Sequence, residues 1–210
     1  MIIEACVENI NEALRAESLG ADRVELCDNL KIGGTTPSAG TIAMAKQLLK
    51  IPIMVLIRPR GGNFIYSSNE IEIMKHDIEI CKEIGINGVV IGALTKEHTV
   101  DKELVNDLIS IARPLEVTFN KAIDITFNIL EEFKNLMQTD IDRVLTSGGA
   151  KTAADGKDII NEMVSISNGK VKVISAGKIH HSDLPILQEL IHSDEFHGKK
   201  IVGNLSNLSI

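Results

Sequence analysis

The sequence predicts an α/β protein, a single (β/α)8 TIM barrel that occupies residues 1–210. Three observations support this prediction. Short runs of β-branched residues alternate with amphipathic stretches along the whole chain, an order typical of parallel sheets with right-handed crossovers. There are eight such runs, the number that closes a TIM barrel. No break in composition divides the chain, so one closed barrel is favoured over the alternative, a doubly wound open sheet.

Each element is expected where the hydrophobic pattern has the matching period. The strands are the short apolar runs at residues 2–6, 23–27, 52–58, 87–92, 115–120, 142–147, 171–176 and 194–197. Helices are expected between them at residues 9–19, 37–49, 69–84, 101–112, 127–139, 152–167 and 181–192. Only residues 198–210 follow the last strand, so we expect the eighth helix to be short, displaced or absent.

Several helix ends carry their own signals. Asn9 and Ser182 are residues of the type that caps helix N-termini, and Pro37 suits a first helical turn. Gly20 and Gly85 stand where glycines commonly end helices, because a glycine adopts the left-handed conformation without strain. These signals support the first, second, third and seventh helices.

Composition excludes some classes of partner. The net charge is −7, whereas nucleic acids and anionic membranes are held by clustered Lys and Arg. Aromatic residues make up 3% of the chain with no Trp, which disfavours a base-stacking surface. The longest apolar runs are far shorter than the roughly 20 residues of a membrane span. With no secretory signal before the first strand and three cysteines, we expect a cytoplasmic protein with reduced thiols.

One short pattern closes each of the first two expected strands, a glutamate followed two residues later by a cysteine. Since strand side chains alternate between faces, Glu4 shares a face with Cys6, and Glu25 shares one with Cys27. Neighbouring strands lie about 4.8 Å apart, so the two sulfurs would suit a soft ion such as Cu(I) or Zn(II). His197 is a possible nitrogen ligand. The alternative is a pair of buried thiols without function, which is common for free cysteine.

Polar residues within the strands are expected to face the barrel interior, and those at the strand ends to line its mouth, where TIM barrels carry their chemistry. The expected set is Glu4, Cys6, Glu25, Cys27, Arg58, Arg60, Thr118, Asn120, Asp124, Ser147, Ser175, Glu195 and His197. A purely structural alternative exists for Glu25 and Arg58, which would neutralise each other as a buried ion pair.

Two glycine-containing segments are candidate anion sites. Arg58 and Arg60 flank a proline and precede two glycines, an arrangement that suits bidentate binding of a carboxylate or phosphate; loop scaffolding is the alternative. After the sixth strand, the glycines of a second segment would free backbone N–H groups for a phosphate. The candidate anion-binding residues are therefore Arg58, Arg60, Ser147, Gly148 and Gly149.

Taken together, these motifs resemble the CutC copper-homeostasis family of TIM barrels. The resemblance extends from residue 2 to about His197. It rests on the segments GADRVELC (20–27), GGTTPS (33–38), IRPRGG (57–62), VLTSGG (144–149) and EFH (195–197). It implies a cytoplasmic protein linked to copper tolerance that self-associates as a homo-oligomer. It also implies that Cys6 and Cys27 are the Cu(I) ligands.

The chain departs from the family pattern at two places. Asn120 and Lys121 stand where the family usually has His and Arg, and Ala176-Gly177-Lys178 replaces a glycine-rich turn. The first change removes an imidazole from the mouth. The resemblance therefore implies that the chemistry of the usual site is altered in this chain.

Three functions stay open at this point. The leading one is copper homeostasis, with Cu(I) bound by Cys6 and Cys27. The alternative is an enzyme acting on a small anionic or phosphorylated metabolite, with Glu25, Arg58 and Asp124 as candidate catalytic residues and Glu25 or Asp124 moving protons. The third is an oligomerising scaffold without chemistry of its own.

Overall fold

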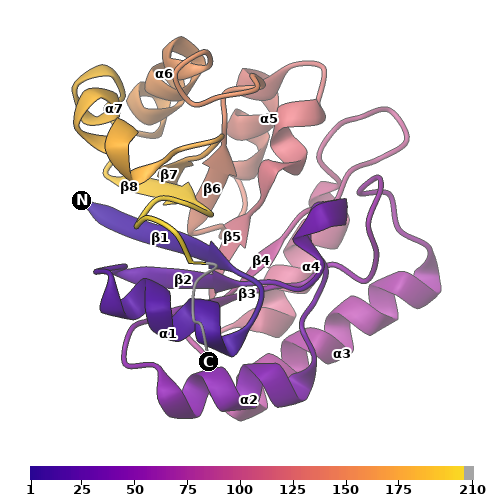
Figure 1. Ribbon diagram of the computed structural model, residues 1–210. Coiled ribbons are helices and arrows are strands. Elements are labelled where there is room, and N and C mark those ends of the chain that lie inside the picture. The colour runs from indigo at the N-terminus through magenta and orange to yellow at the C-terminus, as the bar shows by residue number, and fades with distance from the viewer. Residues whose placement is uncertain (206–210) are drawn as a thin grey trace.

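A computed structural model describes residues 1–205 and contains a closed barrel of parallel strands in chain order (Figure 1). The strands are β1 (Ile2–Val7), β2 (Arg23–Leu26), β3 (Ile53–Leu56), β4 (Gly88–Ile91), β5 (Glu116–Phe119), β6 (Arg143–Thr146), β7 (Lys172–Ser175) and β8 (Glu195–Gly198). β1 pairs with β8 as well as with β2, which closes the barrel. The predicted TIM barrel is confirmed, and the open sheet is excluded.

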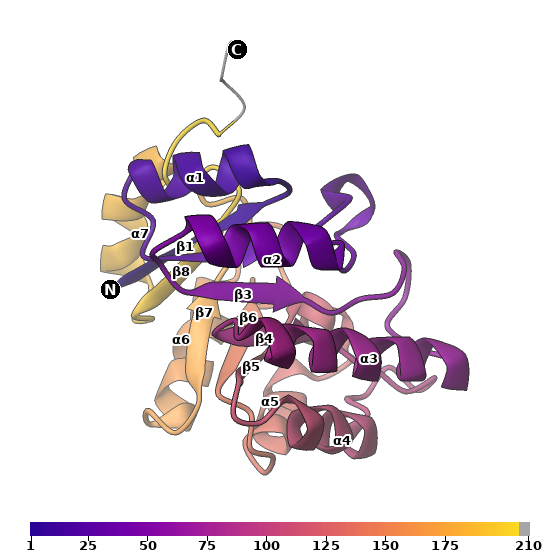
Figure 2. The ribbon, with the colours of Figure 1, turned by 90° about the horizontal axis from the view of Figure 1, so that it is seen from below.

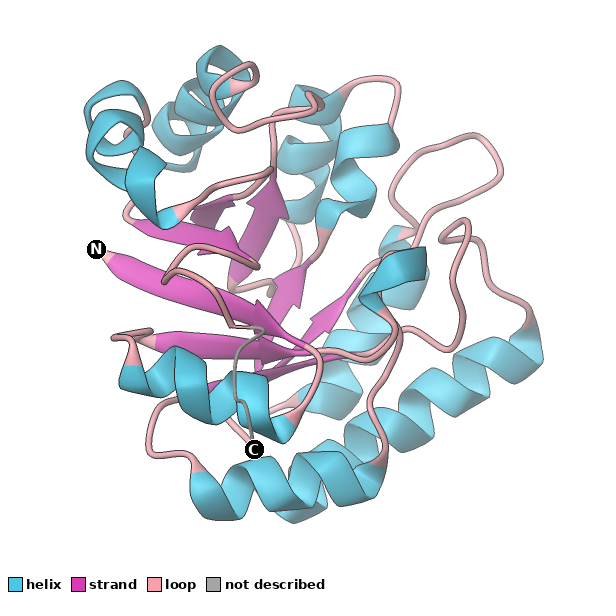
Figure 3. Ribbon diagram, viewed as in Figure 1, coloured by secondary structure: helices cyan, strands magenta, loops and turns pink. Residues whose placement is uncertain are grey.

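Helices surround the strands on the outside of the barrel (Figure 3). They are α1 (Ile10–Ser18), α2 (Ala39–Leu48), α3 (Ser68–Ile84), α4 (Lys102–Ala112), α5 (Ile129–Leu136), α6 (Lys157–Ser167) and α7 (Leu184–Leu190). Three short 3₁₀ turns precede α2, α5 and α7: η1 (Leu30–Ile32), η2 (Lys121–Ile125) and η3 (His181–Asp183). Figure 2 shows the typical arrangement, with α2 and α3 lying along the outer side of β3.

Some helix ends match the sequence signals and others do not. The Asn9 side chain accepts a hydrogen bond from the backbone N–H of Glu12 and caps α1, as predicted. Ser182 does not cap α7, because it lies inside η3 and the helix begins one residue after Asp183. α6 begins at residue 157 rather than 152, since Gly156 is packed tightly against the end of β6 and a Cβ there would lie 1.9 Å from the Ser147 carbonyl oxygen.

The chain after β8 has no helix within residues 199–205, and residues 206–210 lie outside the described part of the chain. This is consistent with the expectation of a short, displaced or absent eighth helix as far as residue 205. Among the described residues, no helix combines the length and the apolar character needed to cross a membrane.

The main hydrophobic core lies between the strands and the helices. It contains the outward residues of the strands, such as Val24 and Val55, together with the inner faces of the helices. The barrel interior is different in character. It holds one apolar cluster around Met54 and Leu56 and a second around Ile174, while the interior of β1, β2 and β8 is charged. Arg143 of β6 joins the same charges, so charged and apolar side chains share the barrel interior.

Candidate functional site

The two cysteines at the ends of β1 and β2 lie against each other. The strand register places Cys6 opposite Glu25, and the backbone N–H of Cys27 donates to the Val7 carbonyl just beyond. The two Sγ atoms are 3.8 Å apart and both side chains are buried. One carboxylate oxygen of Glu25 and the two sulfurs lie within 4.8 Å of one another. The predicted juxtaposition of the sulfurs is present, and metal binding by them stays a prediction.

His197 lies beside this cluster, between two glutamates. β8 pairs with β1 so that His197 is opposite Glu4, and its Nδ1 is 2.8 Å from Glu4 Oε1. Its Nε2 is 3.5 Å from Glu25 Oε2. The imidazole therefore joins the carboxylate of β1 to the carboxylate of β2, at the level of the thiols.

Hydrogen bonding and burial set the protonation of this cluster. The hydrogen bond from Cys27 lowers the pKa of Cys6 to about 5 against the opposing effect of burial, and His197 adds to the lowering. The same pairing raises the pKa of Cys27 well above 9. Burial and the nearby Cys6 charge raise the pKa of Glu25. Burial alone would lower the pKa of His197, but hydrogen bonds to Cys6 and Glu4 raise it. The cluster thus favours one thiolate beside an imidazolium.

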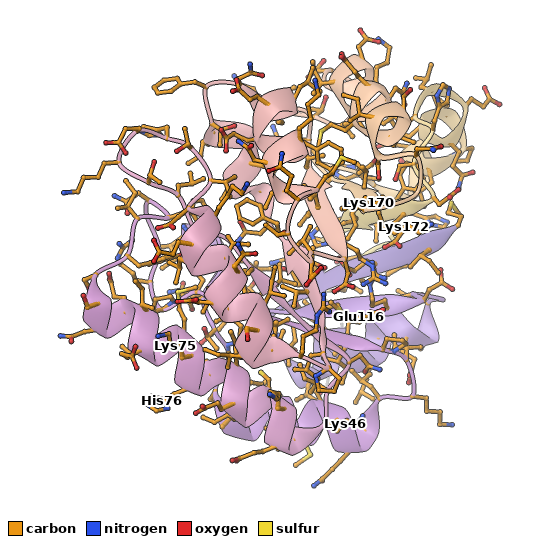
Figure 4. All side chains as sticks on the ribbon, turned by 180° about the vertical axis from the view of Figure 1, so that it is seen from behind. Lys46, Lys75, His76, Glu116, Lys170 and Lys172 are labelled. Atoms are coloured by element: carbon orange, nitrogen blue, oxygen red, sulfur yellow. The ribbon has the colours of Figure 1, made fainter. Side chains whose placement is uncertain are left out.

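A chain of buried ion pairs continues from His197 toward the opposite end of the barrel. Glu4 Oε2 is 2.5 Å from Arg23 Nε, and Arg23 Nη2 is 2.5 Å from Glu195 Oε2. Arg143 then contacts Glu195 at 3.2 Å and Glu116 at 2.9 Å. Figure 4 labels Glu116, which begins β5 at the base of the barrel. The site at the mouth is therefore connected to the base through alternating charges.

Sequence reasoning did not identify Arg23 and Arg143. A signal was available in the alternation of the strands. Arg23 is two residues before Glu25, and Arg143 is four residues before Ser147, so each arginine is on the same strand face as a residue that was expected to point inward. A residue at the start of a strand also faces the interior when its alternate neighbours do. Polar residues at the first position of a strand should therefore also have been expected to face the barrel interior.

The thiols open into a cavity of about 160 Å³ at the mouth. Its polar lining residues are Cys6, Glu25, Cys27, Asn120, Lys121 and His197. Leucines from three different segments and Phe64 close its sides. The cavity therefore brings together the predicted metal ligands and Asn120 and Lys121, the first of the two places where the chain departs from the family pattern.

The two arginines after β3 hold loops together. Arg58 Nη1 donates to the carbonyls of Gly33 and Gly34 at 2.9 and 3.1 Å, and its Nη2 donates to Gly62 at 2.5 Å. Its guanidinium also stacks over Phe64 at 4.4 Å. The alternative in which Arg58 neutralises Glu25 is wrong, because both terminal nitrogens of Arg58 donate to backbone carbonyls instead, and its buried Nε has no partner among residues 1–205.

Arg60 is engaged in a similar way. Its Nε is 2.6 Å from Glu70 Oε1, at the first turn of α3, and its other nitrogens donate to carbonyls of the same loop, including that of Ile65 at 2.7 Å. Anion binding by Arg58 and Arg60 stays a prediction. The geometry supports the alternative of loop scaffolding, since most of their donors already have acceptors.

The predicted phosphate cradle after β6 already holds a carboxylate. Asp124, in η2, accepts from the backbone N–H of Ser147 at 3.0 Å and from that of Gly149 at 2.9 Å. Thr146 Oγ1 donates to the same side chain at 2.5 Å, and Lys121 Nζ lies 2.5 Å from it. The segment is thus an anion-binding nest, as its glycines indicate, but Asp124 occupies it. Binding of an external anion by Ser147, Gly148 and Gly149 stays a prediction.

Other polar residues take positions outside the site. Ser175 was expected to face the interior, but it pairs with Phe196 of the outer core while Ile174 faces inward, so this expectation is wrong by one residue. Thr118 is buried, and its hydroxyl has no partner among residues 1–205.

Cys81 lies in the outer core, where burial raises its pKa to about 12. His76 is on the outer face of α3 (Figure 4).

Comparison with known proteins gives one consistent result. The sequence profile described as the CutC family matches residues 1–202. A human protein named "Copper homeostasis protein cutC homolog" is 42% identical over 93% of this chain and 72% of its own length. A crystal structure assigned as the copper homeostasis protein CutC of Streptococcus agalactiae superposes with a TM-score of 0.91. It is 30% identical and covers 96% of this chain and 99% of that one.

More distant structures share the fold alone. A tetrameric deoxyribose phosphate aldolase from Aeropyrum pernix aligns with 97% of this chain and 87% of its own, with a TM-score of 0.65 and 13% identity. Identity this low carries no information about activity, because unrelated chemistries use the same barrel.

Proposed function

This chain belongs to the CutC family, and from that premise we propose that it serves copper homeostasis by binding Cu(I) through Cys6 and Cys27. The observation that carries the proposal is the distance of 3.8 Å between the two sulfurs. Metal–thiolate bonds are about 2.3 Å long in zinc sites, so two sulfurs up to about 4.6 Å apart can share one ion. The two sulfurs are therefore close enough to bind one ion between them, with a bent sulfur–metal–sulfur angle.

The protonation of the cluster favours a soft monovalent ion. With a pKa of about 5, Cys6 supplies a thiolate at neutral pH, and binding of the ion displaces the proton of Cys27. Glu25, whose pKa is raised by burial, tends to stay neutral and is then a poor ligand for a hard divalent ion. Thiolates suit both Cu(I) and Zn(II), but a structural Zn(II) site takes four ligands, which two thiols and a neutral carboxyl do not supply, so the site favours Cu(I).

A competition titration with a chromophoric Cu(I) chelator tests this proposal. We expect the reduced wild-type protein to remove one Cu(I) per chain from the chelator. The Cys6→Ser and Cys27→Ser variants keep the size of the side chain but replace the soft ligand, and each should lose at least a hundredfold in affinity. Cys81→Ala, which removes a thiol from the outer core, is the matched control and should bind as the wild type does. Equal and weak affinity in all four proteins would contradict the proposal.

Two further properties belong to the same proposal. We expect the protein to be cytoplasmic and to form a homo-oligomer, as the family resemblance implies. Fractionation of cells that express a tagged full chain tests the first expectation. Light scattering on the purified chain tests the second, and a mass of one 22.9 kDa chain over a range of concentrations would contradict it.

A second candidate function is an enzyme acting on a small anionic metabolite. It is supported by the composition of the cavity, in which a low-pKa thiol, an imidazole and a lysine line one small space. Of the three candidate catalytic residues, Glu25 lines this cavity, whereas Arg58 and Asp124 are bound to backbone groups nearby. A thermal-shift screen of anionic metabolites tests this function, and a screen without any stabilising compound would contradict it.

A further inference from the structure

One side-chain donor at the mouth has no acceptor within the described part of the chain. Asn120 follows β5, and its Oδ1 accepts a hydrogen bond of 2.9 Å from the backbone N–H of Ala122. This bond identifies the other side-chain atom as Nδ2, which has no acceptor among residues 1–205. The residue is only 7% exposed and lines the cavity beside the thiols. Nδ2 is not one of the fully enclosed side-chain atoms without a partner, so this amide donor is available to a ligand in the cavity that brings its own acceptor.

The position of this amide is fixed by Gly92, the residue that follows β4. Gly92 lies flat against the Asn120 side chain, and a Cβ at residue 92 would lie 2.1 Å from Oδ1 and 2.8 Å from Nδ2. Any larger residue there would displace the amide. The donor is therefore held between a glycine on one side and a backbone hydrogen bond on the other.

A second donor lies on the next residue. The Lys121 ammonium contacts Asp124 at 2.5 Å and the hydroxyl of Ser147, which uses two of its three N–H groups. The third has no acceptor among the described residues. Lys121 lines the same cavity as Asn120, and its side chain is 42% exposed, so it lies at the rim. Asn120 and Lys121 thus present a neutral and a charged donor to one space.

We propose that the mouth cavity binds a small carboxylate beside the thiols, held by Asn120 Nδ2 and Lys121 Nζ. The inference rests on the second candidate function and names the class and position of its ligand. Two donors match the two oxygens of one carboxylate. The cavity of about 160 Å³ corresponds to about five water volumes, which suits an acid of a few carbon atoms.

A carboxylate fits this space better than a phosphate. The backbone N–H groups that would cradle a phosphate already bind Asp124. Glu25 and Cys6 also line the cavity, so the space favours one negative charge over two. Among the described residues that line the cavity, Asn120 and Lys121 have side-chain nitrogen donors without acceptors, and both lie just after β5.

Calorimetric titration of the reduced, metal-free full chain tests this proposal, with acetate, pyruvate and inorganic phosphate as probes. We expect acetate or pyruvate to bind and to shift the side-chain amide NMR signal of Asn120. Asn120→Asp keeps the acceptor for Ala122 but replaces the donor with a carboxylate, and Lys121→Gln removes the charge. Each variant should bind at least tenfold more weakly than the wild type. Lys151→Gln, an exposed lysine of a neighbouring loop, is the matched control for net charge and should bind as the wild type does.

The outcomes separate the site from the function. Carboxylate binding that depends on Asn120 supports the site even when no turnover follows, and the second candidate function then fails alone. No binding of acetate or pyruvate by the wild type overturns the proposal. Equal binding by folded Asn120→Asp, or tighter binding of phosphate than of either carboxylate, also overturns it.

Discussion

At the scale of single residues, the chemistry of the mouth depends on which polar atoms already have partners. Arg58 has the charge and shape of an anion-binding residue, but carbonyls of two loops take up both its terminal nitrogens. Asn120 has no charge, yet its amide nitrogen lines the cavity and has no acceptor within residues 1–205. Residue type therefore indicates which ligands a side chain is able to bind. The hydrogen bonds that it already makes within the protein determine which of its atoms are left for a ligand.

The pH dependence of stability should reveal the role of Glu4. Burial would raise the pKa of this carboxyl, but the His197 hydrogen bond and the Arg23 charge outweigh it and lower the pKa from 4.5 to about 2. A group with a lowered folded-state pKa stabilises the protein fully above pH 4.5 and loses that contribution as the pH falls toward 2. The lowering corresponds to about 3 kcal/mol. We expect the stability of Glu4→Gln, measured by urea unfolding, to fall less steeply than that of the wild type across this window.

The matched control for this prediction is Glu79→Gln, which changes an exposed glutamate of α3. Its stability should follow the wild-type profile from pH 4.5 to 2. A Glu4→Gln profile that runs parallel to both would show that Glu4 titrates with an ordinary pKa.

At the scale of elements, the sequence predicted what depends on local period, and it missed what depends on contacts between distant segments. Alternation along β1 and β2 was enough to place Glu4, Cys6, Glu25 and Cys27 on the inner face. The same rule failed by one residue at Ser175, because the short run of β7 gives no polar alternation to fix its phase. The turn after β6 donates hydrogen bonds to Asp124, as far as 25 positions away in the sequence, so no local pattern predicts this contact.

The turn after β6 gives a prediction at this scale. Removing the carboxylate in Asp124→Ala should lower the free energy of unfolding by at least about 2 kcal/mol, because several hydrogen bonds to a charged group are lost. The vacated N–H groups of Ser147 and Gly149 should then bind an external anion. We expect added sulfate to raise the melting temperature of this variant more than that of the wild type.

Asp155→Ala is the control, since Asp155 is an exposed acid in the following loop. Its response to sulfate should equal that of the wild type. An Asp124→Ala variant that folds but gains no sulfate response would show that the turn keeps its shape only while the carboxylate is present.

At the scale of the whole molecule, the barrel interior combines a connected network of charges with separate apolar clusters. The alternating charges run from His197 at the mouth through Arg23 and Arg143 to the base, while Met54 and Ile174 mark the apolar parts. The predicted barrel with eight strands is present, but this network was not predicted, because it requires the register between β8 and β1 that only closure provides. Closure places Glu4 between Arg23 and His197.

Arg23 is the central member of this network, and its removal tests the network as a whole. Arg23→Met keeps much of the side-chain volume but leaves Glu4 and Glu195 buried without their shared cation. We expect a loss of about 3–5 kcal/mol in urea unfolding, the usual cost of breaking a buried ion pair. Lys199→Met, which breaks an exposed pair with Glu8, should cost at most about 1 kcal/mol. Equal losses in the two variants would show that the network contributes no more than a surface pair.

The Arg58 bridge between two loops has a consequence for the rate at which an ion enters and leaves. Cys6 and Cys27 are 7% and 1% exposed, so an ion held by them exchanges with solvent only through the mouth. Gly33 and Phe64 line that passage, and Arg58 binds the first and stacks on the second. Tighter loops at this passage would slow the entry and the release of an ion to the same extent and leave its affinity unchanged. Arg58, which holds both loops, would then control the rate at which an ion reaches and leaves the sulfurs.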